Sequence, residues 1–454
     1  MEILIDIMPG LMFLALIFGL FSGLPVAIVL MGITLIFGCV ALSLGEMRYA
    51  QMTLLPNRIY GGIIENPVLV AAPMFVFMGL VLEKTRVADD LLIALQKLLR
   101  VVPGGLALAV TLVGTILAAA TGIIGASVVM LTALALPTMV ARGYSPSLAA
   151  GTIASAGTLG ILIPPSVMLV FMGDLLTLNL AKLFVAALMP GLMLAGLYLV
   201  YIVIIAALRP EKAPKAPRDG SEKFDGWSEM VVSLGLPFLL IVAVLGSILG
   251  GIATPTEASG VGAVAALVLG LARGRLNWTA LSSAMDGSVR TIAMLFFIFV
   301  GATAFSYVFR LIGGEHFIVS TARGLAYGDW GLLIMMMVMI FIMGFFFDWI
   351  EITLIMLPIF APIVQTLDFG DHVAGPDMIY WFAVLVAVNL QTSFLTPPFG
   401  FALFYLKGAG GAHITMAEIY RGIIPFVLVQ LAALAMFIWK PEIVTWLPNV
   451  LLGN

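Results

Sequence analysis

Residues 389–400 read NLQTSFLTPPFG, and residues 157–166 read GTLGILIPPS. Each stretch places two consecutive prolines inside a long apolar run. Because proline lacks an N–H group and strains the carbonyl four residues earlier, an adjacent pair must break a helix. In hydrocarbon, free backbone groups are costly, so a break is tolerated only where protein, water or a ligand satisfies it. The two stretches therefore predict membrane helices that are broken at a functional site.

The composition agrees with a membrane protein. Of the 454 residues, 62% are apolar and only 10% are charged, whereas a soluble domain carries about 25% charged residues. Apolar runs such as 102–140, 147–173 and 183–208 are long enough to cross a bilayer, which takes about 20 residues per helix. We therefore expect an all-α polytopic membrane protein with roughly 11 to 13 membrane segments.

Several functional classes are excluded. The net charge of −3 leaves no basic footprint for nucleic acid. The single cysteine, Cys39, rules out a disulfide framework, and the three histidines are too far apart in sequence to show a metal-ligand spacing. An intramembrane enzyme would need paired aspartates, His/Glu metal ligands or an aspartate-rich motif, and the sequence has none of these. We expect no enzyme activity and no cofactor.

A polar stretch divides the chain. Residues 209–229 carry five Lys/Arg and three Pro and interrupt the apolar sequence. This stretch predicts a linker between a first membrane repeat, residues 1–208, and a second, residues 230–454. Short loops rich in Lys and Arg are usually cytoplasmic, so we expect the linker on the cytoplasmic side.

The two halves repeat one another. Four landmarks recur in the same order: 73–79 with 295–301, the segments starting at Gly105 and Gly331, 131–137 with 352–358, and 162–166 with 395–399. Duplicated halves with broken helices are typical of secondary transporters, whose substrate lies near the midplane at the repeat interface. If each half crosses the membrane an odd number of times, the second half is inverted.

Each half has a second interruption upstream of its prolines, at 117–127 (LAAATGIIGAS) and at 344–353 (GFFFDWIEIT). The apolar runs on either side, about 15 residues each, are too short to span the bilayer comfortably. They predict re-entrant hairpins. In the first half we expect a hairpin at about 104–141 and a broken helix at about 147–173. In the second half we expect a hairpin at about 331–367 and a broken helix at about 379–408.

Polar residues mark these interruptions. Asp348 and Glu351 are acidic residues at membrane depth, which are functional candidates by default. Asp348 is equally well explained as the N-cap of the second arm of its hairpin, and the two roles are compatible. The breaks can likewise be kinks that serve helix packing, but their recurrence at equivalent places favours an ion or substrate site.

Residues just before each break suit a coupling cation. Gly157, Thr158, Thr392 and Thr396 are small or carry hydroxyl groups. Carbonyls freed by a break, together with hydroxyl oxygens, supply the oxygen ligands that a hard cation requires. We predict Na⁺ near these four residues.

Four segments resemble one family. GTLGILIPPS (157–166), TPTEAS (254–259), FFFDWIEITLIMLPIFAP (345–362) and NLQTSFLTPPFGFALFYLKG (389–408) are similar to the large membrane subunit of tripartite ATP-independent periplasmic (TRAP) transporters, of the DctM type. The resemblance covers about residues 8–440. The two Pro-Pro motifs are its most specific part.

This resemblance implies an elevator-type transporter of the bacterial inner membrane, built from two inverted repeats, with a mobile transport domain and a fixed scaffold. It implies symport of dicarboxylates or other organic acid anions with Na⁺. The implied partners are a periplasmic binding protein and a small four-helix membrane subunit on a separate polypeptide. A stand-alone divalent-anion/Na⁺ symporter of similar architecture is the alternative.

The resemblance also implies the site residues. They are Thr121, Gly122, Gly125 and Ser127 at the first hairpin tip, Gly157, Thr158, Pro164 and Pro165 in the following unwound stretch, Asp348 and Glu351 at the second tip, and then Thr392, Ser393, Thr396, Pro397 and Pro398. Many relatives have a serine-rich first tip of the GISGSA kind, whereas TGIIGAS offers fewer hydroxyls. At that tip we therefore expect backbone carbonyls to contribute more.

Overall fold

The computed structural model describes residues 2–121, 124–215, 227–324, 328–373, 375–397 and 400–453. For 2–5, 118–121, 227–233 and 322–323 only the backbone is described. All secondary structure within the described residues is helical. The predicted all-α class is confirmed.

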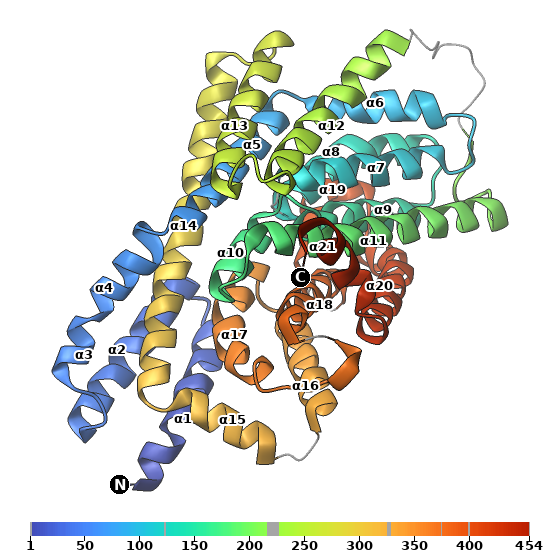
Figure 1. Cartoon of the computed structure of the whole chain (residues 1–454). Helices are drawn as coiled ribbons and strands as arrows, with labels where there is room; N and C mark the ends of the chain where they lie inside the picture. Colours follow the sequence, from blue (N-terminus) through green and yellow to red (C-terminus); the bar gives the residue numbers. More distant parts are fainter. Residues whose placement is uncertain are drawn as a thin grey trace.

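The helices of the first half follow the expected order (Figure 1). Their bounds are α1 Glu2–Leu20, α2 Val26–Leu44, α3 Tyr49–Thr53, α4 Leu55–Ile59, η1 Tyr60–Ile64, η2 Pro67–Val70, α5 Ala71–Lys84, α6 Val87–Leu99, α7 Gly105–Thr121, α8 Ile124–Ala141, α9 Pro146–Thr158, η3 Leu159–Ile161, α10 Val167–Leu175 and α11 Leu180–Leu208. The helices α7 and α8 form the first helix pair, and residues 162–166, between η3 and α10, form the first break.

The second half repeats this order. Its bounds are α12 Trp227–Leu249, α13 Pro255–Ala272, α14 Trp278–Leu311, α15 Gly314–Gly324, α16 Gly328–Met343, α17 Trp349–Val364, η4 Gly370–His372, α18 Gly375–Leu395, α19 Phe401–Gly410, η5 Gly411–His413, α20 Met416–Trp439 and α21 Glu442–Leu452. The helices α16 and α17 form the second helix pair, and residues 396–400, between α18 and α19, form the second break. The landmarks 131–137 and 352–358 lie in α8 and α17, the second arms of the two helix pairs.

The helix lengths agree with a multi-pass membrane protein. Within the described residues, eight helices are long and apolar enough to cross a membrane. By their backbone, α1 and α12 are also of spanning length, with 19 and 23 residues. Three of the four paired arms are shorter: α7 has 17 residues, and α16 and α17 have 16 each.

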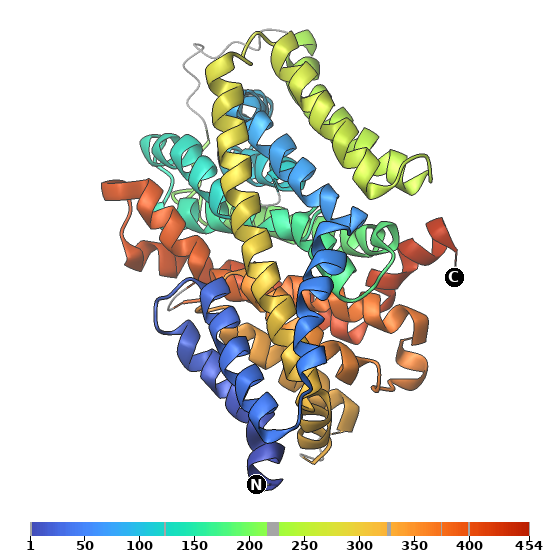
Figure 2. The ribbon, with the colours of Figure 1, turned by 90° about the vertical axis from the view of Figure 1, so that its left-hand side faces the viewer.

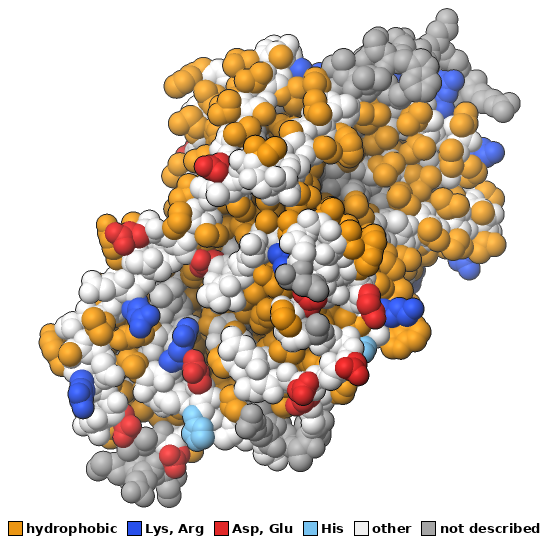
Figure 3. Space-filling view, viewed as in Figure 1, with side chains coloured by type: hydrophobic (Ala, Val, Ile, Leu, Met, Phe, Trp, Pro, Cys, Tyr) orange, Lys and Arg blue, Asp and Glu red, His pale blue; other side chains and the backbone are white. Residues whose placement is uncertain are grey.

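The surface is that of a protein in lipid. Large apolar side chains are widely exposed, among them Phe18 (74%), Val261 (65%) and Phe238 (59%). Figure 3 shows hydrophobic side chains spread over much of one face, with most of the charged side chains in the lower part of the view. Since monomeric soluble proteins rarely expose such extended apolar surface, this face is suited to acyl chains.

Equivalent helices of the two halves pack in equivalent ways. α2 packs on α14, and α13 packs on α5, while α5 also contacts α14. These four helices lie together on one side of the molecule in Figures 1 and 2. The helix pairs and the broken helices α9/α10 and α18/α19 pack among themselves on the other side. The molecule thus has one layer formed by α2, α5, α13 and α14, called the continuous layer below, beside a layer that contains both helix pairs and both broken helices.

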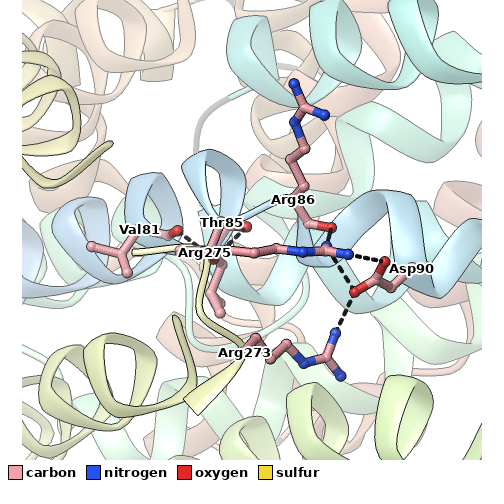
Figure 4. Close-up of polar contacts among 7 residues, drawn as sticks. Val81, Thr85, Arg86, Asp90, Arg273 and Arg275 are labelled. Carbon is pink, nitrogen blue, oxygen red and sulfur yellow. Dashed lines mark hydrogen bonds and ion pairs between the residues drawn. The ribbon is translucent and has the colours of Figure 1, made fainter. Parts of the chain in front are cut away.

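The short helix α6 joins these two layers, since it follows α5 and precedes α7. One face of α6 is apolar and buried, while Asp90 points to the loop between α13 and α14. Arg275 donates to both Asp90 carboxylate oxygens at 2.9 and 3.0 Å, and Arg273 donates to the same carboxylate. Arg275 also donates to the backbone carbonyl of Arg86 at 3.2 Å (Figure 4). These contacts anchor the start of α6 to the continuous layer.

We expect Asp90→Asn to loosen this anchor. It removes the carboxylate charge that pairs with both arginines, whose side chains are 12% exposed at Arg273 and 41% exposed at Arg275. Breaking such a pair by changing one partner costs about 1–3 kcal/mol at a partly exposed site. The predicted result is a Tm several degrees lower for the purified protein. The matched control is Asp286→Asn, which removes an exposed ion-paired carboxylate from α14 and should leave the Tm unchanged. An unchanged Tm in Asp90→Asn would show that the anchor contributes nothing to stability.

Candidate functional site

The first break is enclosed by protein. Residues 162–166, which include Pro164 and Pro165, are all buried. The Ser166 hydroxyl donates to the Ile161 carbonyl at 2.8 Å and so satisfies one carbonyl that the break releases. Irregular backbone is thus kept away from the outer surface of the protein, as a membrane environment requires.

The second break has a similar setting. α18 ends at Leu395 and α19 begins at Phe401, with Thr396 and Pro397 half-buried and Gly400 buried. A side chain at Gly400 would place its Cβ 2.5 Å from the Phe394 carbonyl oxygen, so this close backbone turn requires glycine. Pro398, predicted as a site residue, lies outside the described residues.

Two residues expected in the first unwound stretch, Gly157 and Thr158, are helical, which corrects that expectation. They complete α9, while Thr392 and Ser393 belong to α18 and lie just before the second break. The reason is that proline disturbs mainly the turn just before it. The helices therefore continue to within a few residues of each Pro-Pro pair.

The hydroxyl groups before the breaks donate back to their own helices. Thr158 Oγ1 donates to the Ser155 carbonyl at 3.0 Å, and Thr392 Oγ1 donates to the Val388 carbonyl at 2.8 Å. Thr396 Oγ1 donates to the Thr392 carbonyl at 2.8 Å. Because each hydroxyl uses its one hydrogen in this way, its oxygen retains lone pairs as acceptors, one of which in Thr158 accepts from Gln391 Nε2. This is the form in which a hydroxyl can coordinate a cation.

The interruption of the first helix pair is narrower than predicted. α7 continues through Thr121 and α8 begins at Ile124, so Gly125 and Ser127 lie in the first turns of α8 rather than in a loop. Gly122 lies outside the described residues, as does the side chain of Thr121. Ser127 is buried, with 2% exposure.

The start of α8 contacts both broken helices. A Cβ on Gly157, at the end of α9, would lie 2.7 Å from Val128 Cγ2 of α8. A Cβ on Gly125 would lie 3.0 Å from Cζ of Tyr405, on α19. These glycines permit the close approach of the first helix pair to the helix before the first break and to the helix after the second.

At the second helix pair, Asp348 is the N-cap of α17. Its Oδ1 accepts from the Trp349 N–H at 2.8 Å, and Glu351 Oε2 accepts from the Asp348 N–H at 3.2 Å. Together the two carboxylates form a capping box. The geometry predicted for Asp348 as a cap is therefore present, and both acidic groups lie at the start of one helix.

The second helix pair also contacts both broken helices. A Cβ on Gly344, just after α16, would lie only 1.9 Å from Ser393 Oγ of α18. On the other side, the Trp349 ring of α17 lies 6.4 Å from the Phe171 ring of α10. Both helix pairs thus converge on both breaks, and the predicted residues from the two halves form one region.

Sequence reasoning missed Tyr405. Its ring contacts Gly125 of the first helix pair, and its hydroxyl lies within electrostatic range of Asp348 and Glu351 of the second. It therefore lies between the two pairs. The available signal was an aromatic residue with a polar hydroxyl in the run FALFYLKG directly after the second Pro-Pro pair.

Three further buried polar residues were missed, and they join the two breaks. Gln391 Nε2 donates to Thr158 Oγ1 at 3.4 Å and to the Tyr198 hydroxyl of α11 at 3.4 Å. Gln430 of α20 also donates to that hydroxyl. The amide oxygens of Gln391 and Gln430 are buried and make no hydrogen bond in the described part of the chain. Amides within apolar helices were the signal available in the sequence.

We expect Tyr198→Phe to destabilise this network. The change removes the oxygen that accepts from two fully buried amide groups. A buried donor left without a partner costs about 1–3 kcal/mol. The predicted result is a clearly lower Tm in detergent. A variant as stable as the wild type would show that the amides find other partners.

The whole chain was compared with known proteins. The family model described as "Tripartite ATP-independent periplasmic transporter, DctM component" matches residues 11–443. The chain belongs to this family. The C4-dicarboxylate TRAP transporter large permease protein DctM of Pseudomonas aeruginosa is 31% identical, over 85% of this chain and 87% of the relative. The 2,3-diketo-L-gulonate TRAP transporter large permease protein YiaN of Escherichia coli is 28% identical, over 94% of this chain and 95% of the relative.

The fold is also found among solved structures. The Alcanivorax borkumensis YdaH transporter superposes with a TM-score of 0.60 at 14% sequence identity, over 85% of this chain and 87% of that chain.

Membership of the TRAP family establishes which class of protein this is. The chain is a multi-pass TRAP large permease, and its relatives are named as transporter permeases rather than enzymes. It is one component of a tripartite system, as the family description says. The predicted family is confirmed.

Proposed function

We propose that this permease imports carboxylate-bearing solutes together with Na⁺ across the bacterial inner membrane. The observation that carries the proposal is the convergence of both helix pairs on both breaks, at Gly125–Tyr405, Gly157–Val128 and Gly344–Ser393. Threonine oxygens with free lone pairs and two helix-capping carboxylates face this region or border it. Such oxygen-rich groups suit Na⁺, and helix starts at a break suit a carboxylate.

In this mechanism Na⁺ orders the starts of α8 and α17, and the ordered starts complete the anion site. The helix pairs and broken helices move together as an elevator against the layer of α2, α5, α13 and α14. The packing of these elements into two layers supports that division. The two halves act as inverted repeats, with re-entrant helix pairs and the linker on the cytoplasmic side.

The proposed partners are a periplasmic binding protein, which delivers the solute, and a small four-helix membrane subunit, which supports the continuous layer. Family membership favours this arrangement over a stand-alone divalent-anion/Na⁺ symporter. The names of the two relatives, which refer to C4-dicarboxylate and to 2,3-diketo-L-gulonate, support a carboxylate substrate.

Reconstitution tests the proposal. The permease, its small subunit and its binding protein are placed in proteoliposomes, and uptake of radiolabelled succinate is measured with an inward Na⁺ gradient or with choline in its place. We expect uptake only with Na⁺. Equal uptake in choline would overturn Na⁺ coupling, and a failure of succinate and of a panel of other carboxylates would overturn the substrate class.

A further inference from the structure

A second cavity lies away from the two breaks, where the two layers meet. It has a volume of about 360 Å³, which is within the usual size of small-molecule sites. Its walls come from α4 and η1, from one face of α14, from the end of α10 at Leu175, and from α17 at Leu354 and Pro358.

The face of α14 in this cavity is graded in polarity. Phe299, Thr303, Ser306, Tyr307 and Arg310 recur at spacings of three and four residues, so they share one side of the helix. Along the helix the order is apolar at Phe299, hydroxyl at Thr303, Ser306 and Tyr307, and guanidinium at Arg310.

Two arginines stand at the mouth of this cavity. Arg58 of α4 and Arg310 of α14 both line it, and both are exposed. Within the described residues, Arg58 has no carboxylate at ion-pair distance; its charge lies 5.8 Å from the centre of the Tyr307 ring. Arg310 has one distant partner, Glu315, at 3.6 Å and half-exposed. Both guanidinium groups therefore retain donors for another anion.

A buried hydroxyl deeper in the cavity has no partner. Ser306 Oγ, on a residue only 7% exposed, makes no hydrogen bond in the described part of the chain. Serine in a helix usually bonds to a carbonyl of the preceding turn, and burying an unpaired hydroxyl costs free energy. A ligand that reaches Ser306 from the mouth would satisfy it.

One acidic residue lies near the cavity but does not line it. Asp174 precedes Leu175 at the cavity wall, and its carboxylate accepts a hydrogen bond from Asn66. Two guanidinium groups, a free serine hydroxyl and an apolar floor match a small organic carboxylate better than a neutral or cationic solute.

We propose that this cavity is a second binding site, which receives the carboxylate solute before it reaches the breaks. The proposal rests on the proposed function. The cavity lies along the C-terminal end of α14, which in Figure 1 is far from the start of α12, the helix that follows the polar linker. With the linker in the cytoplasm, the cavity faces the periplasm, where solute is delivered. Its wall on α17 belongs to the second helix pair, so solute held here lies beside the element that must open.

Binding without Na⁺ isolates this site from the site at the breaks. The purified full chain is placed in nanodiscs of neutral phosphatidylcholine, and binding of radiolabelled succinate is measured by equilibrium dialysis in choline buffer. We expect saturable binding that becomes about ten-fold weaker in Arg58→Gln and in Arg310→Gln, since each loses a charge-assisted hydrogen bond. Ser306→Ala should also weaken it.

The matched control is Arg290→Gln, which removes an exposed arginine from the same helix outside the cavity. It should bind succinate like the wild type. Each variant must keep the wild-type Tm. Arg58→Lys retains the charge and should recover part of the binding, so it provides a test that does not depend on the folding of Arg58→Gln. No saturable binding, or equal binding by wild type and the Arg58→Gln/Arg310→Gln double variant, overturns the proposal.

Two further arms separate other outcomes. In nanodiscs that contain anionic phosphatidylglycerol, unchanged succinate binding supports a solute site, while its loss identifies a lipid phosphate as the occupant and overturns the proposal. In reconstituted uptake, the arginine variants should raise KM several-fold with the maximal rate little changed. An unchanged KM would overturn the proposal that the cavity receives the solute before the breaks, but it would not contradict Na⁺-coupled transport. Uptake by the wild type that does not depend on Na⁺ would overturn the proposed function instead.

Discussion

Uptake by a Gly344→Ala variant is expected to be about 10- to 100-fold lower than by the wild type, with normal insertion in the membrane. The added Cβ would lie 1.9 Å from Ser393 Oγ and 2.5 Å from Ser393 Cβ, a distance at which atoms must move. Overpacking of this kind costs about 1–3 kcal/mol. The overpacking therefore destabilises the contact between the second helix pair and the helix before the second break. Initial rates in cells that express the complete system measure the effect.

The matched control is Gly196→Ala in α11, where an added Cβ has nothing within 4 Å. This variant should transport like the wild type. If Gly344→Ala also transports normally at equal membrane levels, the close contact between α16 and α18 has no part in transport.

Removing both carboxylates of the α17 capping box should weaken the dependence on Na⁺. In the double variant Asp348→Asn/Glu351→Gln, asparagine still caps a helix well, so the start of α17 is kept while two negative charges are lost. Neither carboxylate has an ion-pair partner among the described side chains, and unpaired charges at membrane depth need a cation. We expect the Na⁺ concentration for half-maximal uptake to rise about ten-fold or more.

The single variant Asp348→Ala separates the two roles. It removes the cap and costs about 1 kcal/mol of helix stability. Should the double variant keep its normal response to Na⁺ while Asp348→Ala loses stability and transport, the two carboxylates act only as caps.

Much of this architecture follows from local chemistry that the sequence displays. Pro164-Pro165 and Pro397-Pro398 cannot continue a helix, so the positions of both breaks were predictable. The Asp348/Glu351 capping box follows the acidic pattern at three-residue spacing that marks a helix start. Apolar composition and the recurrence of landmarks were sufficient to predict helices in two related halves.

What the sequence could not supply are contacts between distant segments. The contact of Gly125 with Tyr405 joins the two halves, and no periodicity predicts it. The Gln391–Tyr198–Gln430 network depends on three helices meeting at one point. The first unwound stretch was also predicted too long, because a proline disturbs mainly the turn just before it and α9 continues through Thr158.

Binding of radiolabelled Na⁺ to the purified protein tests most directly whether the broken helices exist to hold a coupling ion. Saturable binding is expected in the wild type and in Gly196→Ala. It should fall about ten-fold or more in Thr158→Val and in Thr396→Val, which keep the side-chain shape but remove one hydroxyl oxygen beside each break. Wild-type Na⁺ binding in both threonine variants would contradict an ion site at the breaks.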